Sequence, residues 1–171
     1  MKIKSLYSTY PNWLPICLGF ILRALNLSAP IVGVHSWRQA DTAAMARHFA
    51  LNNTPIWLPQ VDWGGASKGY VECEFPLFPY LIGQAYKLFG INEFIGRFAS
   101  ILFSILTIYI IIRIGSRLID PISGWWGGLF FALLPLNVYY GRTFQAESLL
   151  IFLAAFSIDS LLVWKQSKKD S

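Results

Sequence analysis

Asp41 is the first residue of the sequence whose side chain could act in catalysis. It stands in the polar stretch HSWRQADT, which directly follows the first apolar segment of the chain. Residues 36–51 are rich in alanine and predict a short helix, in whose first turns the dipole favours an ionised carboxylate. Held this close to a membrane-bound segment, Asp41 can accept a proton from a hydroxyl or an amine. The alternative is a structural ion pair with Arg38, three residues earlier.

Two further carboxylates, Glu72 and Glu74, alternate in the segment VECEFP. Pro76 favours an extended Phe75, and in an extended segment both carboxylates point to one side. Such a pair can hold a divalent cation or bind a hydroxylated ligand. The alternative is a solvated loop without a ligand.

The third polar cluster contains Arg142 and Glu147, which share a short run between two apolar segments, GRTFQAE. The planar fork of an arginine matches phosphate oxygens, so Arg142 can bind a lipid phosphate. The alternatives are an anchor at the level of the lipid headgroups and an Arg142–Glu147 ion pair.

Other reactive residue types offer less. Asp159 lies inside the last apolar segment, where an acid is either functional or paired. His35 and His48 are thirteen residues apart and lack the spacing of metal ligands. Cys17 and Cys73 are too far apart in sequence to suggest a disulfide framework or a metal knuckle.

The composition indicates an integral membrane protein. Of the 171 residues, 55% are hydrophobic and only 13% are charged, whereas about a quarter of the residues in a soluble domain are charged. The net charge of +5 comes from dispersed basic residues, which argues against nucleic-acid binding.

Four apolar segments approach the roughly 20 residues that a helix needs to cross a membrane. The sequence therefore predicts an all-α fold, a multipass bundle of about four spans that forms a single membrane domain over residues 1–171. An outer loop with juxtamembrane helices follows the first span, and its apolar residues 76–90 form an interfacial helix, a tilted span or the start of a longer one. Arg23 interrupts the first span and is expected to snorkel to the interface. The predicted segments are 12–29 (first span), 30–97 (outer loop), 98–118, 123–139 and 148–164 (second to fourth spans).

The distribution of basic residues suggests the orientation. With four spans both termini lie on one side, and that side holds seven basic residues against six on the other. Five of those six lie in the long segment before the second span, and the positive-inside rule counts short loops. We therefore expect both termini in the cytoplasm of a cell-membrane protein and Asp41, Glu74 and Arg142 on the outer face.

Taken in order, these segments resemble the membrane glycosyltransferases of family 39, which include protein O-mannosyltransferases and lipid A aminoarabinose transferases and have the C-type glycosyltransferase fold. The likeness covers nearly the whole chain, from about Asn12 to Trp164. It is carried by WRQADTAAMARHFA, ECEFPLFPYLIGQAYKLFG, EFIGRFASILFSIL and LFFALLPLNVYYGRTFQAESLLIFLAAF.

The resemblance implies a role for each cluster. Asp41 matches the essential acid of the first outer loop and would be the catalytic base. Glu74 would bind the substrate headgroup or a divalent metal ion, the one cofactor implied. Arg142 and Glu147 match an arginine followed by an acid at the start of a later helix and would bind substrate, with Arg38 beside them. Where the family often has Lys or His after the glutamate this chain has Phe75, and where it often has Pro before the later acid this chain has Ala146.

The implied reaction transfers a sugar from a polyprenyl-phosphate carrier in the membrane to an acceptor, not identified by the sequence, on the outer face. Family members have many more helices, so the resemblance implies the amino-terminal part of a partial C-type fold: a truncated frame, a domain fragment, or a chain that a partner completes. The alternative function is that of a non-enzymatic small membrane protein, such as a scaffold, an assembly factor or an inactive fragment.

Overall fold

The computed structural model describes residues 11–25, 27, 31, 36–63 and 65–170. The predicted positions of His35, of the amino-terminal lysines and of parts of the first span and outer loop fall outside these residues. The described residues are helical with no strand, which confirms the all-α prediction. Their helices are α2 (Trp13–Ala24), α3 (Ser36–Asn52), α4 (Leu77–Phe89), α5 (Glu93–Leu118), α6 (Pro121–Leu133), α7 (Pro135–Tyr140) and α8 (Glu147–Asp170).

The chain divides into two compact units. One contains α2, α6, α7, α8 and the part of α5 from Ile101 onward, and the other contains α3, α4, the start of α5 and residues 142–146. Each unit is described by itself.

Two helices are long and apolar enough to cross a membrane, the segments Glu93–Leu118 and Glu147–Lys168. They contain the predicted second and fourth spans. The predicted first span corresponds to α2, an apolar helix of 12 residues. The predicted third span, 123–139, is divided into α6 and α7 at Leu134. Two of the four predicted spans are therefore matched by helices of sufficient length, and a topology of four spans stays a prediction.

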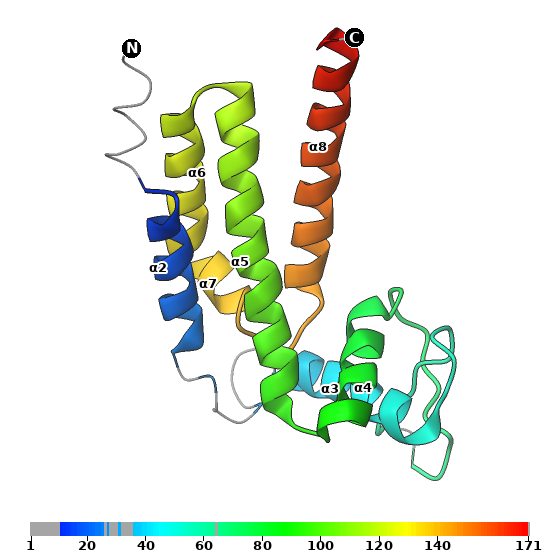
Figure 1. Cartoon of the computed structure of the whole chain (residues 1–171). Coiled ribbons are helices and arrows are strands. Elements are labelled where there is room, and N and C mark those ends of the chain that lie inside the picture. The colour runs from blue at the N-terminus through cyan, green and yellow to red at the C-terminus, as the bar shows by residue number, and fades with distance from the viewer. Residues whose placement is uncertain (1–10, 26, 28–30, 32–35, 64, 171) are drawn as a thin grey trace. The chain divides into compact units, whose positions relative to one another are not determined.

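In the first unit, α2, α5 and α6 lie side by side (Figure 1). Ile108 and Ile112 of α5 and Ala132 of α6 form a buried apolar cluster against which Ile16 of α2 packs. Small residues let α5 and α6 approach closely: a Cβ atom on Gly115 would lie 2.6 Å from the Cα of Gly124. Close approach through small residues is a usual basis of helix association in membranes.

Proline explains why the third apolar segment is two helices. Pro135 has no N–H group to donate to the carbonyl of Phe131, so the helix cannot continue unbroken. Arg23 of α2 supplies donors instead: its Nη1 donates to the carbonyl of Ala132 at 3.0 Å and its Nη2 to that of Phe131 at 3.4 Å. Its Nε also donates to Ser104 Oγ at 2.7 Å.

Arg23 is fully buried. The prediction that it snorkels to the membrane surface is therefore wrong, because its guanidinium group is used inside the unit to satisfy the carbonyl groups at the end of α6.

Asp159 of α8 is also buried, and its carboxylate is paired with two arginines of α5. Its Oδ2 lies 3.0 Å from Arg113 Nη2, and its Oδ1 bonds to Arg117 Nη1. The ring of Phe152 on α8 packs on that of Phe103, with 5.5 Å between the centroids. An ion pair and an aromatic contact thus join α5 to α8.

In the second unit, α3 and α4 pack together through a glycine. A Cβ atom on Gly83 would lie 2.7 Å from the Cβ of Phe49 and 2.9 Å from the carbonyl oxygen of Ala46. The ring of Phe49 meets that of Tyr80 edge to face, with 5.3 Å between the centroids. Because α4 is an apolar helix over Leu77–Phe89, the prediction of a helix within residues 76–90 is confirmed.

Candidate functional site

The side chains of Arg38 and Glu74, 36 residues apart, form an ion pair. Arg38 Nη2 donates to Glu74 Oε1 at 2.9 Å, and the two side chains are 47% and 70% exposed. Arg38 lies in the first turn of α3, whereas Glu74 precedes α4. The packing of α3 on α4 therefore brings together two of the residues that the sequence analysis assigned to substrate binding.

Asp41 lies one turn further along α3 and is half-buried. Its carboxylate makes no hydrogen bond or ion pair with any described residue, and the local pair with Arg38 is not formed. Because α3 begins at Ser36, Asp41 is its sixth residue, beyond the first turn where the helix dipole acts. The carboxylate is thus available to accept a proton.

A small cavity of about 20 Å³ adjoins the Arg38–Glu74 pair, with Thr42, Met45 and Cys73 in its lining. Burial and the negative charge of Glu74 raise the pKa of the Cys73 thiol. The Cys73 thiol is therefore less ionised than that of an ordinary cysteine. It lines the cavity and is a poor nucleophile.

Among the residues that the structure describes, the carboxylates near Glu74 do not form a set of metal ligands. Glu74 is paired with Arg38, and Glu72 is exposed without a hydrogen bond in the described part of the chain. Within the same residues, no three His, Cys, Asp or Glu side chains converge. A hard divalent cation needs several oxygen ligands, so metal binding by Glu74 stays a prediction, without a supporting ligand set.

Arg142 and Glu147 belong to different units of the structure, so each is described with its own unit. Arg142 opens the segment 142–146, which packs on α3 and α4 through Phe144. Phe144 is fully buried, and its ring meets that of Phe78 edge to face at 6.0 Å. Its N–H donates to Gln39 Oε1 at 3.2 Å. Glu147 is the first residue of α8.

Gln39 and Phe144 position the loop that carries Arg142, and the sequence analysis missed both. The only local indication was that Gln39 sits in the same polar stretch as Arg38 and Asp41. Its partner lies 105 residues further along the chain, which no local pattern reveals.

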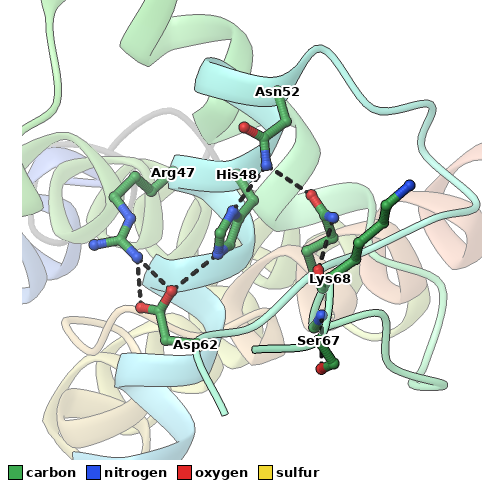
Figure 2. A network of polar contacts seen from close by, with 8 residues as sticks. Arg47, His48, Asn52, Asp62, Ser67 and Lys68 are labelled. Carbon is green, nitrogen blue, oxygen red and sulfur yellow. Dashed lines mark hydrogen bonds and ion pairs between the residues drawn. The ribbon is translucent and has the colours of Figure 1, made fainter. Parts of the chain in front are cut away.

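A polar network on the other side of α3 was also missed (Figure 2). Arg47 forms an ion pair with Asp62, and the Nε2 of His48 lies 2.9 Å from the same carboxylate. Asn52 Nδ2 approaches His48 Nδ1 at 3.1 Å and donates to Gln60 Oε1 at 2.8 Å. Since the Asn52 amide donates to Nδ1, this arrangement requires the tautomer of His48 that carries its hydrogen on Nε2.

The network lowers the pKa of Asp62. Burial alone would raise it, but the hydrogen bond from His48 and the charge of Arg47 outweigh that effect. A hydrogen bond within the loop that follows α3 extends this network: Gln60 Nε2 donates to the carbonyl of Lys68 at 2.8 Å. The network thereby ties the loop after α3 to the last two turns of that helix.

An open groove of about 450 Å³ lies beside this network, with Arg47, Asp62, Tyr86 and Glu93 in its lining. Its size falls within the usual range for sites that bind small molecules. The unit formed by α3 and α4 thus has two polar sites: the cavity beside Arg38–Glu74 and this groove.

The described chain thus combines two helices long and apolar enough to cross a membrane with polar sites in the unit of α3 and α4. Residues 74–170, more than half of the chain, match the family of dolichyl-phosphate-mannose-protein mannosyltransferases, and the chain belongs to that family. The family is membrane-embedded and indicates a glycosyltransferase-type function. Comparisons with curated proteins and with solved structures gave no match. The matched residues include Glu74, Arg142 and Glu147 but not Arg38 or Asp41.

Proposed function

We propose that the chain acts in a membrane glycosyltransferase that moves a sugar from a polyprenyl-phosphate carrier to an acceptor on the outer face of the membrane. Membership of the mannosyltransferase family supports the lipid-linked donor. The single observation that carries the assignment of the site is the position of Asp41, a half-buried carboxylate without a described partner, next to the Arg38–Glu74 ion pair.

In this proposal Asp41 is the general base. It takes the proton from an acceptor hydroxyl while the oxygen attacks the anomeric carbon of the sugar. The bond between that carbon and the phosphate oxygen breaks, and the electron pair leaves with the polyprenyl phosphate. Attack from the face opposite the phosphate inverts the anomeric configuration.

Arg38 and Arg142 are assigned to the phosphate. The guanidinium of Arg38 is nearly half exposed and is positioned by Glu74, and the planar fork of a guanidinium matches phosphate oxygens. Arg142 begins the loop that Phe144 anchors and would contribute a second cation. Positive charge there stabilises the leaving phosphate as the bond breaks. Glu74 is the positioning residue for Arg38, and Glu147 is assigned to substrate binding.

The proposal is tested with Asp41→Asn in the full chain, expressed in its membrane. Membranes are supplied with radiolabelled polyprenyl-phosphate mannose, and label transferred to acceptor material is counted. Loss of a general base reduces the rate by about 10²- to 10⁴-fold, with membrane insertion unchanged. Glu72→Gln is the matched control, because Glu72 is an exposed carboxylate of the same unit without a described hydrogen bond. Transfer by Asp41→Asn at the rate of the Glu72→Gln control would remove Asp41 from the mechanism.

Membranes with the unaltered chain that transfer no label beyond membranes without it would favour a non-enzymatic role. In that case the chain would act as a scaffold or an assembly factor.

A further inference from the structure

The floor of the 450 Å³ groove is formed by three alanines of α3. Ala40, Ala43 and Ala44 have helical spacing i, i+3, i+4 and therefore share one face of the helix. Because their methyl groups are small, they leave room above the helix. The groove thus has a shallow apolar floor of the kind that can contact the C–H face of a ring.

The walls of the groove combine the apolar residues Ile31 and Ile91 with polar side chains, two of which are held in place. Arg47 and Asp62 are fixed to each other and to His48 by the network of Figure 2. Glu93 stands at the first position of α5, exposed and without a hydrogen bond or ion pair among the described residues. The walls therefore present an arginine and two carboxylates, which can donate to and accept from the same ligand.

Tyr86 adds a hydrogen-bond donor to the lining of the groove. Its side chain lines the groove and the residue is only 4% exposed, yet no described residue forms a hydrogen bond with its hydroxyl. Burial and the charge of Glu93 raise the pKa of Tyr86 to about 12, so the hydroxyl keeps its proton and remains a donor. The hydroxyl oxygen is not among the fully enclosed, unpaired polar atoms of the described residues, so it opens to the groove, where a ligand hydroxyl can accept its hydrogen bond.

The groove flanks Asp41. On the surface of a helix the neighbours of a residue lie three and four positions away. For Asp41 these include Ala44 on the groove side and Arg38 with Met45 on the side of the Glu74 cavity. The carboxylate of the assigned base therefore stands on the ridge between the two sites.

We propose that the groove binds a sugar as the acceptor of the transfer, which places donor phosphate and acceptor on opposite sides of Asp41. This inference rests on the proposed function for its chemistry. A polyhydroxylated ring fits the mixed donors and acceptors of the walls and the methyl floor.

The test measures binding directly and needs no turnover. Ala43→Cys places a thiol on the groove floor, and native Cys73 reports on the other cavity of the same molecule. The full chain in lipid nanodiscs is treated with a maleimide at mildly alkaline pH, and labelling at each cysteine is followed by peptide mass spectrometry. The probes are methyl α-mannoside, maltose and lactose. Ala40→Cys is a second reporter should Ala43→Cys fold poorly.

A sugar that occupies the groove slows labelling of Ala43→Cys by the factor 1 + [sugar]/Kd, about tenfold at roughly nine times Kd, and leaves Cys73 unchanged. Tyr86→Phe should raise the sugar concentration for half-protection about three- to tenfold. Glu93→Gln should raise it at least as much, because the lost acceptor is charged. The matched controls Tyr80→Phe and Glu72→Gln lie outside the groove lining and should leave protection unchanged.

Three results would overturn the assignment. The first is that no sugar affects labelling, and the second is that protection falls equally in the two controls. The third is that a serine- and threonine-rich peptide protects where sugars fail, which would assign the groove to a polypeptide. These outcomes are distinct from failure of the proposed function, since protection is a binding measurement. Asp41→Asn with unchanged transfer would refute the base while leaving sugar protection intact.

Discussion

Replacement of Asp159 by asparagine tests how α5 and α8 are joined. The Asp159 side chain is only 4% exposed, and both of its oxygens contact arginines of α5. Asparagine has nearly the same size and keeps one acceptor oxygen, so packing is little changed. The substitution removes the negative charge that lies between Arg113 and Arg117.

The expected loss of stability follows from the burial of the three groups. Removing one partner of a fully buried ion pair costs about 3–5 kcal/mol, because the remaining charge is left without compensation. Here the arginine side chains are 37% and 27% exposed, so water screens part of their mutual repulsion. We therefore expect Asp159→Asn to lower the free energy of unfolding by about 2–3 kcal/mol.

The assay is unfolding of the purified chain in mixed micelles by increasing detergent denaturant, followed by tryptophan fluorescence. Asp120→Asn is the matched control: Asp120 caps α6 by accepting from the Ser123 N–H at 2.7 Å, and asparagine caps a helix about as well as aspartate. A second substitution, Arg117→Met in the Asp159→Asn chain, should restore part of the loss. The reasoning is refuted if Asp159→Asn is no less stable than Asp120→Asn.

Three further predictions concern packing, the buried arginine and pH. Gly83→Ala should lower the free energy of unfolding by about 1–3 kcal/mol, measured in the same assay, since its Cβ would lie 2.7 Å from that of Phe49. Arg23→Lys should cost about 1–3 kcal/mol, because a lysine cannot reach all the carbonyl and hydroxyl acceptors that Arg23 bonds. The pKa of Asp62 is lowered below 3.8, so its ion pair with Arg47 stabilises the fold fully above pH 3.8 and loses that contribution as the pH falls through the folded-state pKa. Since both groups are exposed, the loss should be well under 1 kcal/mol.

Each of these has a control. Gly127→Ala adds a methyl group at ordinary contact distance from Ile111 and should be neutral or stabilising, and equal losses at the two glycines would contradict the packing argument. If a second conservative change, Arg38→Lys, costs as much as Arg23→Lys, the buried hydrogen bonds of Arg23 are not the cause. The acid-dependent loss should disappear in Asp62→Asn, and its persistence would assign it to other groups.

Much of the local structure was predictable because it depends on residue type along short stretches of chain. The alanine-rich segment after Ser36 predicted a helix, and α3 ends where Asn53 adopts φ of 51°, a left-handed conformation that asparagine tolerates at helix ends. The apolar residues around Ile105 and Leu153 predicted the two long helices α5 and α8. The family resemblance was likewise carried by ordered short motifs.

Pairing between distant residues was not predictable in this way. Two acids were available to Arg38: Asp41, three residues away, and Glu74, 36 residues away. The local pattern offered only Asp41. The packing of α3 on α4 makes Glu74 the partner of Arg38, because the close approach of the two helices at Gly83 fixes the position of the segment before α4.

The sequence by itself determined the residue types: helix-forming apolar segments, the proline that ends α6, and a carboxylate at position 41 beside a basic residue. The tertiary structure decided which of these groups meet. Burial of Arg23 became favourable only because the break at Pro135 leaves carbonyl groups that need donors. The groove lined by Arg47, Tyr86 and Glu93 likewise depends on the packing of residues from three different helices, α3, α4 and α5. Side-chain chemistry is a property of each residue, whereas desolvation and partner choice depend on the packing of the whole chain.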